Sequence, residues 1–146
     1  MEIRRILCPV DFSDTSSHAF DYAIELASRF GAELHLVHAY QLPAYALPDG
    51  AFVATPEFAA RVADESQQQL NKLVESHASS NLKFETHLVE GVAHAEIVRV
   101  AKEMAADLIV MGTHGRSGIT HFLLGSVAER VVRSSMCPVL TVRKPD

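Results

Sequence analysis

The feature that most constrains the fold is a regular alternation of short apolar segments with longer segments of helical periodicity. Short runs rich in β-branched residues are typical of buried strands. We expect strands at Ile3–Phe12, Glu33–Tyr40, Leu82–Val89, Asp107–Gly112 and Pro138–Val142. The helices expected between them are one that starts at Ser13 or Asp14 and stops at Gly31, followed by Pro56–His77, Ala93–Ala105 and Phe122–Ser134. This order predicts an α/β fold: an open, doubly wound parallel sheet with helices on both faces.

Composition narrows the class of protein further. The 146 residues are 48% hydrophobic and 21% charged, with no linker or shift in composition, so one domain over residues 1–146 is expected. The net charge of −5 and the lack of a Lys/Arg run argue against nucleic-acid binding. No apolar run approaches the roughly 20 residues that span a bilayer, and the N-terminus lacks the pattern of a signal peptide. We therefore expect a cytoplasmic protein whose partner is a small molecule or another protein.

The strongest motif lies between Met111 and Val127. Gly112, Gly115, Gly125 and Ser126 follow the spacing G-x2-G-x9-G-S. The first glycine closes a predicted strand, the second allows backbone N–H groups to approach a ligand, and the last pair lies at a helix start, where anions bind. The spacing fits neither a Walker A loop nor G-x-G-x-x-G. The motif predicts a phosphate-binding loop, and the alternative is that these glycines only shape a tight connection.

Three blocks of sequence give the chain a resemblance to a known family. They are ILCPVDFSDTSSHAFDYA at the start, DLIVMGTHGRSG in the middle and LLGSVAERVVRSSMCPVLTV at the end. Over nearly its whole length the chain resembles the universal stress proteins, whose ATP-binding branch is marked by the G-x2-G-x9-G-S/T pattern. The resemblance implies a five-stranded sheet of order 3-2-1-4-5 that binds ATP, or ADP or AMP, with any Mg²⁺ held by the phosphates. It also implies that the base pocket is lined by Pro9, Val10, Ala39 and Met111.

Asp11 and its neighbours are the second candidate region. A carboxylate at the end of the first strand can accept hydrogen bonds from ribose hydroxyls. Its alternative role is to help Ser13 and Asp14 cap the first helix. Because Pro9 has no N–H, it interrupts the ladder of a central strand, and the carbonyls of Pro9 and Val10 become candidate partners for an adenine edge.

Two side chains in the glycine-rich segment allow alternative roles. His114 can act as a general base near neutral pH, or it can pack the loop or touch a phosphate. Arg116 can pair with a phosphate or point into water. Because no second carboxylate is identifiable beside Asp11, no catalytic residue is assigned. The complete set expected to bind the nucleotide is Pro9, Val10, Asp11, Ala39, Met111, Gly112, His114, Gly115, Arg116, Gly125, Ser126 and Val127.

Cysteine and histidine spacing predicts neither a disulfide nor a metal site. Cys8 and Cys137 lie in predicted strands that are not neighbours, and both are expected to be small buried hydrophobic residues. His35 and His38 are three apart in a predicted strand, which places them on opposite faces of the sheet. No metal ligand set is therefore expected.

Two further segments lead to predictions. Gln41–Thr55 is long for a connection without regular structure, so it is either a variable surface loop or a lid or partner surface. Pro138–Val142 is expected at one edge of the sheet, where an apolar strand needs covering. Pairing with a second copy satisfies that need, so a homodimer is predicted.

Three functions remain open from the sequence. The first is a stress-response signalling module whose state depends on a bound nucleotide. The second is an enzyme, a slow ATPase or a nucleotidyl-transfer enzyme of the same α/β group, although the phosphate motifs of the latter are absent. The third is an interaction subunit that never uses nucleotide.

Overall fold

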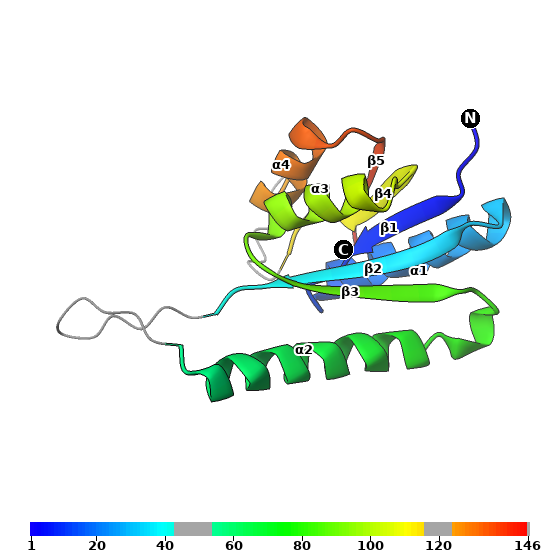
Figure 1. Cartoon of the computed structure of the whole chain (residues 1–146). Coiled ribbons are helices and arrows are strands. Elements are labelled where there is room, and N and C mark those ends of the chain that lie inside the picture. The colour runs from blue at the N-terminus through cyan, green and yellow to red at the C-terminus, as the bar shows by residue number, and fades with distance from the viewer. Residues whose placement is uncertain (43–53, 116–123, 146) are drawn as a thin grey trace.

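The computed structural model describes residues 1–42, 54–115 and 124–145, which contain a single five-stranded sheet. All pairings are parallel, and the strand order is β3-β2-β1-β4-β5 (Figure 1). The predicted doubly wound fold and its strand order are therefore confirmed. The strands are β1 (Arg5–Pro9), β2 (Glu33–Tyr40), β3 (Phe84–Glu90), β4 (Leu108–Gly112) and β5 (Val139–Val142).

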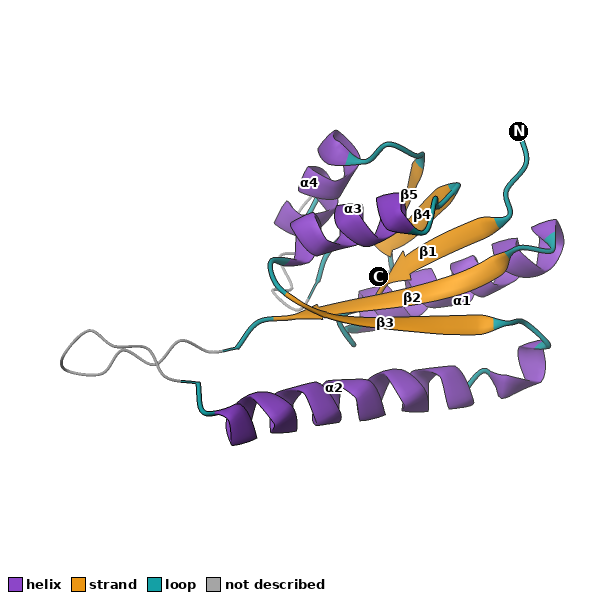
Figure 2. Ribbon diagram, viewed as in Figure 1, coloured by secondary structure: helices purple, strands orange, loops and turns teal. Residues whose placement is uncertain are grey.

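Helices cover the two faces of this sheet in pairs (Figure 2). One face packs against α1 and α2, and the other packs against α3 and α4. The central strand β1 is apolar on both faces: Ile6 and Cys8 point to the first pair of helices, and Leu7 points to the second. The helices are α1 (Asp14–Phe30), α2 (Pro56–Glu75), α3 (Ala93–Glu103) and α4 (Ser126–Ser134), with a short 3₁₀ turn η1 (Ala78–Ser80) before β3.

Local signals in the sequence set the ends of α1. Ser13 is its N-cap, and the Ser13 side chain accepts a hydrogen bond from the N–H of Ser16 at 3.2 Å. Gly31 ends the helix in the left-handed conformation with φ of 64°, a region that glycine enters without steric cost. This exit lets the chain turn directly into β2, whose bounds match the prediction.

Several predicted boundaries differ from the structure, and two of the errors bear on the connections around β1 and α4. The last helix begins at Ser126 rather than Phe122, because Gly125 has the extended conformation of an N-cap (φ −60°, ψ 156°) and Leu124 is not helical. The first strand ends at Pro9, so Asp11 lies in the β1–α1 connection instead of at the strand end. Both corrections place polar groups of connecting segments at the same edge of the sheet.

The segment Gln41–Thr55 lies mostly outside the described residues, since positions 43–53 are not among them. Its role as a lid or partner surface stays a prediction. Within the described helices, none is both long and apolar enough to cross a membrane.

The two cysteines lie in or beside strands that β4 separates. Cys8 is fully buried in β1, and burial raises the pKa of its thiol. Cys137 is half-buried just before β5, with its Sγ 3.5 Å from Ser135 Oγ. Cys8 therefore matches the expected buried and unreactive thiol, whereas Cys137 is less buried than predicted.

Candidate functional site

A cavity of about 200 Å³ lies at the carboxyl ends of β1 and β4. The chain leaves β1 toward α1 on one face and leaves β4 toward α4 on the other. Open α/β sheets bind ligands at such a point, where the direction of winding reverses. The described lining residues are Pro9, Val10, Asp11, Ser16, Val37, Ala39, Ala93, Ile97, Met111, Gly112, Thr113, His114, Gly115, Gly125, Ser126, Val127 and Ala128.

The structure gathers the predicted site residues around this one cavity. Of the twelve, eleven line it, although they come from β1, the β1–α1 connection, β2, β4, the β4–α4 connection and α4. The remaining residue, Arg116, lies outside the described part of the chain. Segments separated by more than a hundred positions in the sequence thus meet at one edge of the sheet.

One part of the cavity is apolar. Val37 and Met111 project from β2 and β4 on the α3 side of the sheet, and Ile97 of α3 lies against them. Together with Ala39 and Ala93 they form a wall without polar side-chain atoms other than a thioether sulfur. Such a surface suits a flat, weakly polar ring, and the backbone groups at its rim are the source of directional contacts.

Sequence reasoning missed six of the lining residues. Val37 could have been predicted from the sequence, because it precedes Ala39 by two positions on the same strand and therefore lies on the same face of the sheet. Thr113 was also accessible, since it lies between two predicted site residues. The other four depend on which helix face meets the sheet, and this is decided by tertiary packing: Ser16, Ala93, Ile97 and Ala128.

The motif glycines permit close approach of backbone segments. A Cβ atom on Gly125 would lie 2.8 Å from the carbonyl oxygen of Thr113, to which the Gly125 N–H donates at 2.7 Å. A Cβ atom on Gly115 would lie 2.5 Å from Asp11 Oδ2. At both positions a larger residue forces its neighbours to move. The glycines therefore shape a tight connection, and this same connection forms the wall of the cavity.

The first turn of α4 faces the cavity without a side-chain cap. Its N-cap is Gly125, which has no side chain to accept a hydrogen bond from the N–H groups that follow. Ser126, Val127 and Ala128 all line the cavity. Uncapped N–H groups and the positive end of the helix dipole make this turn suitable for an anionic ligand group.

Asp11 lines the cavity and also makes hydrogen bonds at the start of α1. Its Oδ1 accepts the N–H of Ser13 at 2.9 Å, and its own N–H donates to Ser16 Oγ at 3.3 Å. The next residue, Phe12, has φ of 63°, a left-handed conformation that is uncommon for a bulky residue. Strained backbone of this kind is concentrated at functional sites. The connection thus holds the Asp11 carboxylate at the cavity, and its hydrogen bonds to Ser13 and Ser16 fix the start of α1.

The carbonyl of Val10 already has one partner within the protein. His38 Nδ1 lies 2.8 Å from the Val10 oxygen, so this ring nitrogen carries a proton and donates it. The Val10 N–H donates to the carbonyl of Val37 at 2.9 Å. A ligand that contacts this carbonyl must use its second lone pair, a constraint that the sequence did not reveal.

His114 has one unpaired polar atom at the cavity. Its Nδ1 lies 3.0 Å from Thr113 Oγ1, whereas its Nε2 is buried and has no hydrogen-bond partner among the residues that the structure describes. Asp11 is the only carboxylate in the described lining. The site therefore combines one carboxylate, one imidazole and a series of backbone N–H groups, which suits binding of a polar anionic molecule.

The contact between Gly115 and Asp11 leads to a quantitative prediction. Gly115→Ala should lower the free energy of unfolding by about 1–2 kcal/mol, because the new methyl group must displace the Asp11 carboxylate. In an Asp11→Ala background the obstructing oxygen is absent, and less than half of this loss should remain. Urea unfolding of the original protein, the two single variants and the double variant measures the coupling.

Asp11→Asn supplies the matched control for this cycle. It replaces the carboxylate by a group of the same size, so Gly115→Ala should cost as much in that background as in the original protein. Equal losses in all three backgrounds would show that Gly115 does not act through Asp11.

The fold and the cavity define a class: a doubly wound α/β protein with a ligand cavity at the switch point of its sheet. The universal stress protein family matches residues 2–143 of the chain. The chain belongs to the universal stress protein family, as its motifs predicted.

Individual relatives are similar over almost the whole chain. Universal stress protein MJ0531 of Methanocaldococcus jannaschii is 40% identical over 144 residues, which cover 97% of this chain and 83% of that protein. A universal stress protein solved in complex with cAMP is 27% identical, with a TM-score of 0.73 and coverage of 97% and 98%. The universal stress protein from Archaeoglobus fulgidus in complex with dAMP is 25% identical, with a TM-score of 0.67 and the same coverage.

Proposed function

We propose that this chain is a cytoplasmic regulatory module of the stress response whose state depends on an adenine nucleotide bound in the cavity, with ATP as the expected ligand. The observation that carries the proposal is the convergence of eleven predicted site residues on one cavity beside an uncapped helix start. The solved relatives in complex with cAMP and dAMP support an adenine nucleotide as the class of ligand.

Each part of a nucleotide has a chemically suitable counterpart in the cavity. The base fits the apolar wall near Val37 and Met111, with its polar edge toward the backbone of Val10. The ribose hydroxyls can donate to the Asp11 carboxylate. The phosphates fit the glycine connection and the first turn of α4, where N–H groups point at the ligand.

Any Mg²⁺ would be held mainly by the phosphates. Mg²⁺ keeps several of its waters and needs only one or two protein carboxylates. Asp11 is the only carboxylate in the described lining, and its Oδ1 already accepts a backbone N–H. The proposed module therefore binds metal through the nucleotide instead of through a preformed protein site at this cavity.

Small molecules released from the freshly purified, denatured protein test the identity of the ligand. Mass spectrometry should detect an adenine nucleotide in an amount comparable to that of the protein, and the same spectrum separates ATP from ADP and AMP. A guanine or pyrimidine nucleotide at that level would refute the assignment of the base.

We also propose that the protein forms a homodimer through β5. This strand lies at the edge of the sheet, and Leu140 within it and Met136 just before it are exposed. An apolar edge with open backbone groups promotes association, and twofold pairing closes it.

The register of β5 identifies which backbone groups face the open edge. The carbonyls of Pro138 and Val142 accept N–H groups from Ile109 and Thr113 on the β4 side. Because backbone groups alternate in direction along a strand, those of Leu140 also point to β4. The groups of the alternate residues, Val139 and Thr141, point away from β4 and are available to a second copy.

A further inference from the structure

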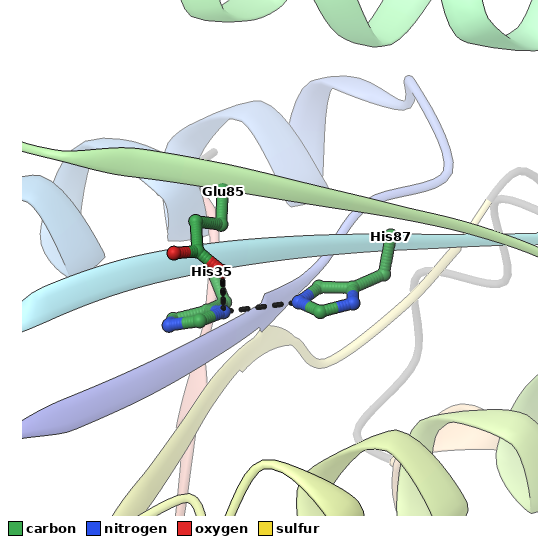
Figure 3. Close-up of side chains that lie close together, drawn as sticks. All are labelled: His35, Glu85 and His87. Atoms are coloured by element: carbon green, nitrogen blue, oxygen red, sulfur yellow. Dashed lines mark hydrogen bonds and ion pairs between the residues drawn. The ribbon is translucent and has the colours of Figure 1, made fainter.

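A second cluster of polar side chains lies on the α3/α4 face of the sheet, outside the cavity. His35 of β2 and Glu85 and His87 of β3 point toward one another (Figure 3). The register of β2 and β3 explains why these side chains lie close together, since His35 pairs with Glu85 and Val37 pairs with His87. Alternate residues share a face, so all three side chains project on one side.

The spacing of the nitrogen and oxygen atoms matches a metal coordination shell. His35 Nδ1 lies 3.0 Å from His87 Nε2 and 3.5 Å from Glu85 Oε2. One ligand atom from each residue lies within 4.8 Å of the other two. Tetrahedral zinc with bonds of about 2.0–2.1 Å places its ligand atoms about 3.3 Å apart. The three side chains need little movement to reach that arrangement.

His35 is held in an orientation suited to a metal ligand. Its side chain is only 6% exposed, and its Nε2 is buried with no hydrogen-bond partner among the described residues. Glu33 Oε2 lies 3.6 Å from that nitrogen. A carboxylate behind a ligating histidine fixes the tautomer and orients the ring. A small rotation of the half-exposed Glu33 completes that contact and leaves the Nδ1 lone pair for a metal.

Glu85 has a cationic neighbour that competes with a metal ion for its carboxylate. Lys83 Nζ lies 3.3 Å from Glu85 Oε1 and is a competitor for the carboxylate, but it is mostly exposed and can swing into solvent.

We propose that His35, Glu85 and His87 bind one Zn²⁺ ion, with water in the fourth position. Two imidazoles and one carboxylate form a ligand set that zinc accepts, and the half-exposed Glu85 leaves an entry path from solvent. The site is distinct from the cavity, since none of the three residues lines it. The proposal departs from the sequence expectation of no metal site, which compared His35 only with His38 and not with a residue 52 positions away.

Calorimetric titration of Zn²⁺ into the tag-free, nucleotide-free protein tests the site. We expect one ion per chain, and His87→Gln and Glu85→Gln should each weaken binding at least tenfold. These two variants are chosen because His35 is buried and its replacement disturbs the core. His18→Gln, on α1 across the sheet, is the matched control and should bind as the original protein does.

The visible absorption of bound Co²⁺ gives a second test, because it reports on the ligands of the metal and not on the stability of the fold. Co²⁺ in a site of low coordination number should give visible absorption bands that Zn²⁺ abolishes and that are missing from His87→Gln. Zn²⁺ binding that is equal in the original protein and in both site variants would overturn the proposal. Absence of binding to the original protein at Zn²⁺ concentrations on the order of 100 μM, which correspond to about −5.5 kcal/mol, would overturn it as well.

Discussion

Gly125→Val is expected to weaken the binding of adenine nucleotides at least tenfold while the protein remains folded. The first carbon of the new side chain would meet the carbonyl oxygen of Thr113 at 2.8 Å and the Cα of His114 at 3.4 Å, and neither backbone atom can move without shifting the connection. The displacement carries the first turn of α4 away from the cavity. The affinity for ATP should fall at least tenfold, or by about 1.4 kcal/mol, in a calorimetric titration.

Ser134→Val is the control for this substitution. It places the same side chain on the same helix at an exposed position outside the described cavity lining, so its nucleotide affinity should be unchanged. Circular dichroism of both variants verifies the fold. Full affinity in a folded Gly125→Val protein would show that the glycine connection is not part of the binding site.

Thr141→Pro is expected to convert a dimer into a folded monomer. Proline removes the N–H that points to the open edge of β5 and leaves the hydrogen bonds to β4 in place, because edge strands tolerate proline on their solvent side. Light scattering after size-exclusion chromatography should give twice the chain mass for the original protein and the mass of one chain for the variant.

Leu140→Pro is the matched comparison, one position away. The N–H of Leu140 points toward β4, so its loss breaks the ladder inside the chain and should lower the unfolding temperature. We therefore expect Thr141→Pro to dissociate the dimer without lowering the unfolding temperature of the chain, whereas Leu140→Pro should lower it. A monomeric original protein at concentrations on the order of tens of micromolar would refute the β5 dimer.

The sequence predicted the features that local signals determine. The apolar run of β4 and the alternation in β3 identified a central and an edge strand, and Ser13 and Gly31 marked the ends of α1. The glycine spacing located the connection that lines the cavity, because backbone segments approach there too closely for a side chain. Each of these signals operates over a few residues and is visible without the fold.

Features that depend on register or on packing were not predictable in the same way. The cluster of His35 and His87 requires knowing that β2 pairs with β3 and which residues face each other. The contact of His38 with the Val10 carbonyl joins β2 to the residue that follows β1 through a side chain. The start of α4 was placed four residues early because the apolar residues before Gly125 continue a helical pattern that the extended cap interrupts.

Calorimetric titration of ATP, ADP and AMP into protein stripped of nucleotide tests the central claim most directly. We predict saturable binding of at least one of them at one site per chain, with no comparable binding to the Gly125→Val variant. Absence of binding at millimolar concentrations of all three, by a protein verified as folded, would contradict the assignment of the cavity as an adenine-nucleotide site.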